Sequence, residues 1–227
     1  MFIHLHCHSH YSFLDAVPSP QELVEAAVAA AAPAVALTDT NGLYGALPFY
    51  QAARAAGIKP ILGTLLDVEN ETRLLLLAES LAGYSNLCRL VTLRHLEDRP
   101  VHFDELAAHR DSLIALHAPA TPSAADDRIA LLHDLFPAAL YLEAWNIGNA
   151  ASNLREVLRL SKRFSLPYAA TNNVHFLRPD DHLHHRVLNA IRTSSLVSQI
   201  AAPDVASRLT ASKMAWPRPR APAGRRV

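Results

Sequence analysis

The feature that most constrains the fold of this chain is a regular alternation of short apolar runs and longer segments with helical periodicity. The short runs are rich in branched residues, which predicts strands, and the longer segments predict helices. The predicted strands cover residues 2–7, 34–38, 59–63, 73–78, 112–116, 139–143 and 167–171. The predicted helices cover residues 20–32, 46–56, 85–96, 104–109, 124–135, 150–163 and 181–192. This order is typical of βα units around a parallel sheet.

About seven strands, each followed by a helix, predict an α/β fold of the TIM-barrel-like (β/α) type, and the length of 227 residues is near the usual value. An open doubly wound sheet is the alternative. No glycine-rich phosphate loop follows a predicted strand, which argues against a nucleotide-binding sheet. We expect one domain over residues 1–200. Residues 201–227 are rich in proline and arginine and are expected to be a disordered tail, although a basic tail could also contact nucleic acid.

Composition excludes several classes of protein. Half of the residues are hydrophobic, and Lys plus Arg equals Asp plus Glu at 21 each, which argues against intrinsic disorder and against a globally basic surface for nucleic acid. Only Cys7 and Cys88 occur, without paired spacing, which favours a reducing compartment. The sequence shows neither a signal peptide nor an apolar stretch long enough for a membrane span. We therefore expect a cytoplasmic protein without a membrane partner.

Histidine is abundant, with 13 in the chain, and four of them alternate at the start: His4, His6, His8 and His10. Alternate residues of a strand share a face, so paired imidazoles at this spacing can bind one metal ion. Further nitrogen and oxygen ligands follow the predicted strands, where the active sites of barrels lie. These residues are Asp15, Asp39, Glu79, His117, Glu143, Asn173 and His175. Imidazole with carboxylate suits Zn, Mn or Fe, and several ions could activate water for phosphoryl chemistry.

Each candidate also has a simpler interpretation. Asp15 could be a turn or helix-cap residue, and Asp39 could hydrogen-bond only to loop backbone. Glu143 could be a charge at the rim of the barrel without a metal. His182, His184 and His185 fall on a predicted helix, for which a solvated surface is the favoured interpretation.

Four segments of the chain resemble the motifs of the PHP (polymerase and histidinol phosphatase) domain. They are HLHCHSHYSFLDA at 4–16, ALTDTNGLYGA at 36–46, GIKPILG at 57–63 and ATNNVHF at 170–176. Within that family, GYSNLCRLV at 83–91 and LNAIRT at 188–193 are similar to the branch at the N-terminus of the bacterial DNA polymerase III alpha subunit, including its error-prone form. The resemblance covers residues 1–200 in the right order.

The resemblance implies a distorted seven-stranded (β/α) barrel with a cluster of divalent metal ions for phosphoester hydrolysis. In some polymerase PHP domains this activity is a 3′ to 5′ exonuclease, and in others it is absent because ligands are lost. Carried over by position, the metal ligands implied are His6, His8, Asp15, His117 and His175. Asp39 and Glu143 are possible additions. One further histidine is expected, for which His95, His102 and His109 are candidates.

Three positions depart from the family pattern. Thr40 stands where the second motif has histidine, Leu65 where the third has glutamate, and Asn173 where the fourth has aspartate. Threonine is a poor ligand, leucine cannot bind a metal, and asparagine keeps an oxygen but loses the charge. The metal set is therefore expected to be reduced or lost. Asp67 and Glu69 lie near Leu65 in the sequence and could compensate only if the strand phase allowed it.

Two functional hypotheses follow, and no catalytic residue is assigned in either. One is a metal-dependent phosphoesterase that acts on a DNA 3′ end or on a small phosphate ester, including the histidinol-phosphatase type. The other is a non-catalytic structural PHP module, which the three departures favour. Polymerase activity is not expected from a chain of this length. The change into a Pro/Arg-rich segment suggests a truncated or frameshifted polymerase gene, and other replication subunits are possible partners.

Overall fold

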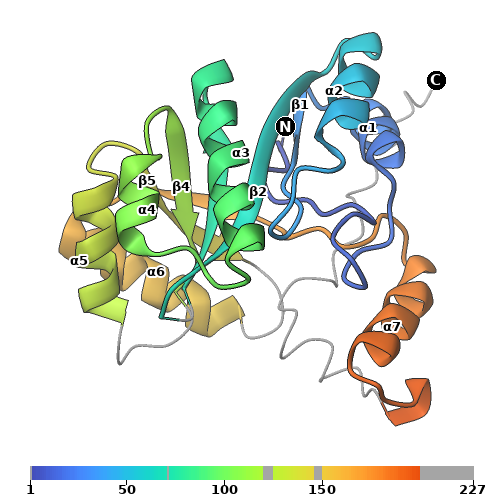
Figure 1. Cartoon of the computed structure of the whole chain (residues 1–227). Helices are drawn as coiled ribbons and strands as arrows, with labels where there is room; N and C mark the ends of the chain where they lie inside the picture. The colour runs from blue at the N-terminus through green and yellow to red at the C-terminus, as the bar shows by residue number, and fades with distance from the viewer. Residues whose placement is uncertain (1, 71, 120–124, 146–149, 200–227) are drawn as a thin grey trace, which may run out of the picture.

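A curled sheet of six strands forms the centre of the molecule in the computed structural model, which describes residues 2–70, 72–119, 125–145 and 150–199 (Figure 1). The strands lie in chain order, and each pairs with the next. Their bounds are β1 (Ala34–Leu37), β2 (Lys59–Val68), β3 (Thr72–Ala78), β4 (Leu113–His117), β5 (Leu140–Trp145) and β6 (Tyr168–Thr171). The expected α/β fold of distorted-barrel type is confirmed.

The N-terminal segment lies between the two edges of this sheet instead of forming the regular first strand that we expected at residues 2–7. On one side it bonds to β1, where the amides of Ala36 and Thr38 donate to the oxygens of His4 and Cys7 at 2.9 and 2.8 Å. On the other side, Cys7 forms a parallel bridge with Val174, just beyond β6. These bonds place an extended strand-like segment where a seventh strand would close the barrel.

Strand β3 runs antiparallel to both of its neighbours, β2 and β4, so the expectation of an all-parallel sheet is wrong at this strand. The sequence pattern ends the third predicted strand at residue 63, whereas β2 continues to Val68. A tight connection that includes Asn70, at a φ of 59°, then reverses the chain directly into β3. Two strands joined by so short a connection pair antiparallel, because a parallel pair needs a long crossover.

Helices cover the outer face of the sheet. Their bounds are α1 (Pro20–Ala29), α2 (Ala46–Ala55), α3 (Leu81–Leu96), α4 (Phe103–Ala108), α5 (Ala125–Leu135), α6 (Ala150–Phe164) and α7 (Asp181–Arg192), followed by the 3₁₀ turn Val197–Gln199. A capping box is present at the start of α1, where Ser19 and Glu22 each bond the backbone of the other. Gly57 follows α2 with a φ of 71°, the left-handed conformation in which a glycine commonly ends a helix.

Two apolar clusters hold these helices against the strands. The larger packs α3 to α6 on the outward leucines of β2 and β3, such as Leu66, Leu74 and Leu76, all of which are fully buried. The smaller packs α1 and α2 against β1 around Leu23, Val35 and Phe49. In Figure 1, α7 lies at one edge of the molecule, far from α5 and α6. Helix α7 is therefore outside both clusters.

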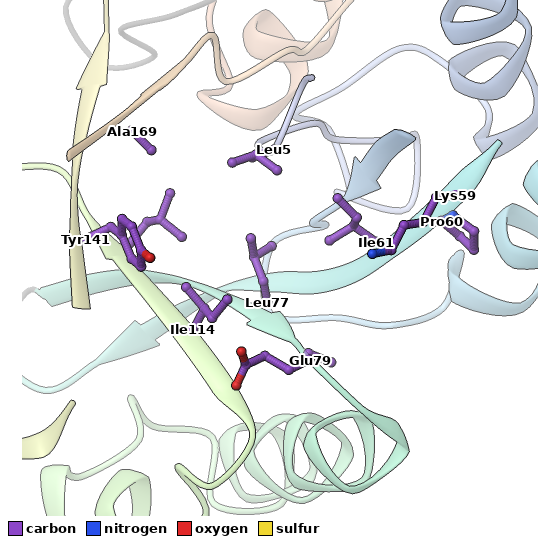
Figure 2. A pocket seen from close by; sticks show the side chains of 11 residues that line it. Leu5, Lys59, Pro60, Ile61, Leu77, Glu79, Ile114, Tyr141 and Ala169 are labelled. Atoms are coloured by element: carbon purple, nitrogen blue, oxygen red, sulfur yellow. The ribbon is translucent and has the colours of Figure 1, made fainter. Parts of the chain in front are cut away.

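The interior of the barrel is apolar toward the amino-terminal ends of the parallel strands. A cavity of about 460 Å³ lies there, lined by side chains that include Leu5, Ile61, Leu77 and Tyr141 (Figure 2). Glu79 also lines this cavity, because antiparallel β3 ends at the amino-terminal ends of its neighbours. The expectation that Glu79 joins the other ligands is therefore wrong.

The expected disordered tail, residues 201–227, lies outside the described part of the chain. Among the described residues, no helix combines the length and the hydropathy that crossing a membrane requires.

Candidate metal centre

His6 is fixed by an ionised carboxylate inside the barrel. Its Nδ1–H donates to Glu143 Oε1 at 2.6 Å, and the hydroxyl of Thr171, at the end of β6, donates to the same oxygen at 2.5 Å. Burial raises the pKa of Glu143, but His6 and the Thr171 hydroxyl outweigh it and hold that pKa below its ordinary value. In the neutral ring, a proton on Nδ1 leaves the Nε2 atom of His6 with a free lone pair.

His8 turns its Nε2 atom toward the same point. This atom lies 3.1 Å from His6 Nε2 and 2.9 Å from Asn173 Oδ1. Burial, followed by the nearby His175 and His6, lowers the pKa of His8 well below its ordinary value, so the ring is neutral at pH 7. A neutral ring has one donor and one acceptor nitrogen, and its other hydrogen bond decides which is which.

Asp39 and Ser12 determine which nitrogen of His8 carries the proton. The Asp39 carboxylate, at the end of β1, accepts the Ser9 amide at 2.6 Å, the Ser9 hydroxyl at 2.8 Å and the Ser12 hydroxyl at 2.7 Å. Ser12 has only one proton to give, so its oxygen accepts from His8 Nδ1–H at 3.0 Å. Asp39 therefore binds two side chains of the loop as well as its backbone, and through Ser12 it directs the Nε2 lone pair of His8 inward.

Three buried ligand atoms thus lie together: His8 Nε2 is in hydrogen-bond range of both His6 Nε2 and Asn173 Oδ1, and with Nδ1 protonated on both rings no donor stands between them. Such an arrangement is stable only when a proton or a cation lies among the lone pairs. The ligands of a tetrahedral zinc ion lie about 3.3 Å apart, because Zn–N distances are about 2.0 Å. The observed separations of 3.1 and 2.9 Å are close to that spacing, so these residues fit a divalent metal ion.

The turn after β6 positions both ligands of the fourth motif. Val174 is held to the N-terminal segment by two backbone bonds, to His6 O at 2.9 Å and from His8 N at 2.8 Å. Asn173 has a φ of 44°, a left-handed conformation that Asn and Asp tolerate better than most residues. The backbone therefore presents the Asn173 side chain to His8, and the next residue but one, His175, stacks its ring on His8 at a centroid distance of 4.5 Å.

His175 belongs to a second group, together with Asp15. Its Nδ1–H donates to the backbone oxygen of Asp15 at 2.8 Å, and burial lowers the pKa of its ring below the ordinary value. His185, on α7, faces this pair and is fully buried, and burial lowers its pKa to about 4. The expectation of a solvated surface is wrong for His185, whereas His184 is exposed and His182 is partly exposed.

His117 lies at the end of β4, beside β5, and is 5% exposed. Its Nδ1–H donates to the backbone oxygen of Arg73 at 3.1 Å, so its hydrogen bond goes to the start of β3. Burial lowers its pKa, while the nearby Glu143 acts in the opposite direction. The structure therefore places His117 near Glu143.

The positions that depart from the family pattern lie where ligands would be needed. The Thr40 hydroxyl is 3.5 Å from His8 Nδ1, and the Thr40 amide donates to Ser12 Oγ. Leu65 packs inside the barrel with Leu75 and Leu116. Nothing near it in the sequence compensates: Asp67 pairs with Arg73 and Asn41, and Glu69 with His102.

None of the three candidates for the further histidine lies at the centre. His95 donates to the backbone of Asn41 from an exposed position, while His102 and His109 cap the two ends of α4. His185 is a buried histidine for which the sequence predicted no ligand role. In the sequence, His185 stands four residues before Asn189 on an amphipathic helix, so the two share one face. That spacing indicates a buried histidine only when the packed face of α7 is known.

The fold and these ligands define a distorted α/β barrel with a candidate divalent-metal centre at the carboxyl ends of its parallel strands. The sequence matches the PHP domain over residues 4–161, more than half of the chain, and the chain belongs to that family.

Its relatives include bacterial replication proteins. The chain is 33% identical to a DNA polymerase III subunit alpha of Chlamydia trachomatis and 33% identical to an error-prone DNA polymerase of Symbiobacterium thermophilum. The matches cover 82% and 87% of this chain but only 19% and 21% of the relatives, so the chain spans about a fifth of their length.

Solved structures support the fold. A protein from Bifidobacterium adolescentis, described as a metal-dependent phosphoesterase, matches with a TM-score of 0.57 at 15% identity. The match covers 76% of this chain and 87% of that protein.

Proposed function

We propose that this chain is a structural PHP module in which His6, His8 and Asn173 hold one divalent metal ion that stabilises the closed barrel. The observation that carries the proposal is the pair of short contacts of buried His8 Nε2, at 3.1 Å to His6 Nε2 and at 2.9 Å to Asn173 Oδ1. His6 and His8 lie on the N-terminal segment and Asn173 lies just beyond β6, so a shared ion would join the two edges of the barrel. Among divalent ions, two imidazoles favour Zn, Mn or Fe over Ca or Mg.

A structural role is favoured over catalysis by burial. His6, His8 and Asn173 are 2%, 0% and 8% exposed, which leaves a substrate little access to an ion bound among them. Leu65 adds to this argument, because a side chain from the apolar interior occupies the position where the family has a carboxylate.

The second candidate function is the phosphoesterase of the family, and the additional candidate ligands favour it: buried His117 and His175 and partly exposed Asp15. A bound divalent ion would supply Lewis-acid activation of water and of a phosphoryl oxygen. In that case His6 would be oriented by Glu143, and His8 by Ser12 and Asp39, as the hydrogen bonds described above allow. The substrate would be a DNA 3′ end or a small phosphate ester.

The partners proposed for either function are DNA or subunits of a replication complex. Support comes from the relatives, which are named as DNA polymerases.

Metal analysis coupled to hydrolysis separates the two candidates. The purified chain is stripped with a chelator, reloaded with Zn or Mn and assayed on a chromogenic phosphodiester and on a 3′-labelled oligonucleotide. A structural module retains metal that depends on His8 but hydrolyses neither substrate above the level of a His8→Ala control. Hydrolysis that is lost in His8→Ala would establish the phosphoesterase instead. A chain that retains no metal after reloading would contradict both candidates.

A further inference from the structure

A second group of buried ligand atoms lies beside the first, where the loop after the N-terminal segment meets the turn after β6 and helix α7. Asp15, His175 and His185 each place a ligand atom within 4.8 Å of the other two. Each side chain also has one buried atom without a hydrogen-bond partner among the described residues: Asp15 Oδ1, His175 Nε2 and His185 Nδ1. Buried polar atoms are normally paired, so three unpaired ones in one cluster indicate that a bound group is missing from it.

We infer that Asp15, His175 and His185 hold a second divalent cation, with His185 of α7 as a ligand that lies outside the four sequence motifs. The inference rests on the proposed function only in requiring that this chain binds divalent metal. The two sites share no ligand, since the first uses His6, His8 and Asn173.

The chemistry of the three groups selects the kind of ion. One carboxylate and two imidazoles suit Zn, Mn or Fe better than Ca or Mg, which prefer oxygen ligands. The bond from His175 Nδ1–H to the Asp15 backbone oxygen leaves the lone pair of His175 on Nε2, the unpartnered atom. One ligand atom of each side chain lies within 4.8 Å of the other two, and the ligands of a tetrahedral ion lie about 3.3 Å apart, so a bound ion would draw the three side chains closer together.

Asn189 controls the other nitrogen of His185. Its Nδ2 donates to His185 Nε2 at 3.3 Å and to the His185 backbone oxygen at 3.0 Å, while its Oδ1 accepts from Arg192 at 2.5 Å. In this arrangement Nδ1 of His185 carries the ring proton, which a bound cation would displace to Nε2. When Nδ1 of His185 binds the cation, Nε2 carries the proton and needs an acceptor. Asn189 then turns its amide so that Oδ1 accepts this proton, and the exposed Arg192 turns to water.

This site would also explain how α7 is attached. Only His185, Asn189 and Ala190 of the helix are buried, while Leu183 and Ile191 are 57% and 58% exposed. The helix therefore has little apolar packing to hold it, and a shared ion would join it to the barrel. His185 would supply an imidazole in a chain that lacks the one expected at Thr40.

Cobalt spectroscopy tests whether His185 touches the ion. In His185→Cys, a bound Co²⁺ acquires a thiolate ligand, which produces a near-ultraviolet charge-transfer band that imidazole and carboxylate do not. His184→Cys is the matched control, since it adds a thiol to the exposed face of the same helix. We expect the band in His185→Cys alone, and identical spectra for the two variants would overturn the inference.

Metal stoichiometry separates this inference from the proposed function. Zinc per folded chain is measured in the parent, His8→Gln, His185→Gln and Asp15→Asn, with circular dichroism to confirm folding. Two ions in the parent and one in each variant support both sites. Asp15 lies closer to the surface, so its variant keeps the test valid if His185→Gln fails to fold.

The remaining outcomes are also decisive. A single ion that is lost only in His8→Gln keeps the proposed function and overturns this inference. A single ion that is lost only in His185→Gln and Asp15→Asn keeps this inference and overturns the proposed site of His6, His8 and Asn173. A parent that binds no zinc overturns both the proposed function and this inference.

Discussion

At the scale of single residues, the candidate centre depends on which nitrogen of each imidazole carries its proton. Glu143 fixes the proton of His6 on Nδ1, and Ser12, itself bound to Asp39, fixes that of His8 on Nδ1. Both rings therefore turn their Nε2 lone pairs to one point. Partners of this kind, which do not touch the metal themselves, commonly change metal affinity when they are removed.

Ser12→Ala tests this control of the His8 proton. Without the Ser12 oxygen, Nδ1–H of His8 loses its acceptor, and the ring is free to turn or to shift its proton. We expect zinc affinity to fall by about 10- to 100-fold, measured by competition with a chromophoric chelator. Ser9→Ala is the control, because the Ser9 hydroxyl binds Asp39 but not His8. An equal loss of affinity in both variants would contradict the assigned role of Ser12.

Residues also show the limit of inference from sequence. His6, His8 and Asn173 could be predicted to lie together because barrels gather strand ends, and the structure places them in contact. His185 could not, since a histidine on an amphipathic helix is buried or solvated according to how that helix packs. Asp39 could be interpreted in either way until its three hydrogen bonds were known.

At the scale of elements, the reversal from β2 into β3 decides what the barrel interior contains. Leu65 of β2 is paired with Leu75 of β3, which is paired with Leu116 of β4, so one row of leucines crosses the interior below the centre. The sequence pattern shows that these residues are apolar. The pattern does not show the direction of β3, because a run that is buried on both faces has no alternation to reveal it.

Leu65→Glu tests the meaning of this departure from the family pattern. In metal-free protein the buried carboxylate should lower the free energy of unfolding by about 3 kcal/mol or more, measured by urea denaturation. Leu65→Met, which nearly conserves volume, should cost less than about 1.5 kcal/mol.

Combining Leu65→Glu with Thr40→His and Asn173→Asp restores the family ligands. The triple variant should bind more zinc per chain than the parent, and the added metal should recover part of the stability lost in Leu65→Glu. A triple variant that binds no more metal than the parent would show that our alignment of these positions is wrong.

The start of α3 is a second feature at this scale. The helix begins at Leu81, four residues before the predicted start, because Ser80 caps it by accepting the Gly83 amide. Gly83 packs closely on the backbone of Ser112, the residue before β4. A Cβ atom at position 83 would lie 2.1 Å from Ser112 O.

Gly83→Ala should therefore shift α3 and destabilise the protein by about 1 to 3 kcal/mol. Gly42→Ala is the control, since its Cβ would press at 3.0 Å only on the exposed side chain of Tyr44, which can move, and would lie in ordinary contact with Thr40 O at 3.5 Å. Thermal unfolding of the two variants measures the difference, and equal midpoints would refute the close packing of α3.

At the scale of the whole molecule, the burial of neutral histidines should make the free energy of unfolding fall at acidic pH. Burial lowers the pKa of His4 and of His185 to about 4, while unfolded histidine titrates near 6.5. Between these values the unfolded chain binds more protons than the folded one. The free energy of unfolding of metal-free protein should therefore be level above pH 6.5 and fall between pH 6.5 and 4 by about 1.4 kcal/mol per pH unit for each such histidine.

Urea denaturation at a series of pH values measures this slope. His185→Gln should reduce the slope by about 1.4 kcal/mol per pH unit, the contribution of one buried histidine. His184 is exposed, so His184→Gln should leave the slope unchanged. A parent protein whose stability does not change between pH 6.5 and 4 would contradict the burial of neutral imidazoles.

The architecture as a whole was more predictable than its closure. Alternating apolar runs predict the barrel class correctly, because each run and each helix has its own periodicity. Closure depends instead on an N-terminal segment that bonds to β1 and to Val174 without forming a regular strand. Such a segment has only part of the ladder of a true strand, which is where a shared metal ion would contribute most.

Thermal unfolding with and without metal tests this central claim most directly. The chelator-treated protein is melted alone, with excess zinc, and with zinc in the His8→Ala variant. We predict that zinc raises the unfolding midpoint of the parent, as a ligand that binds only the folded state must, and that His8→Ala abolishes most of this rise. A midpoint that zinc leaves unchanged in the parent would contradict a metal ion that closes the barrel.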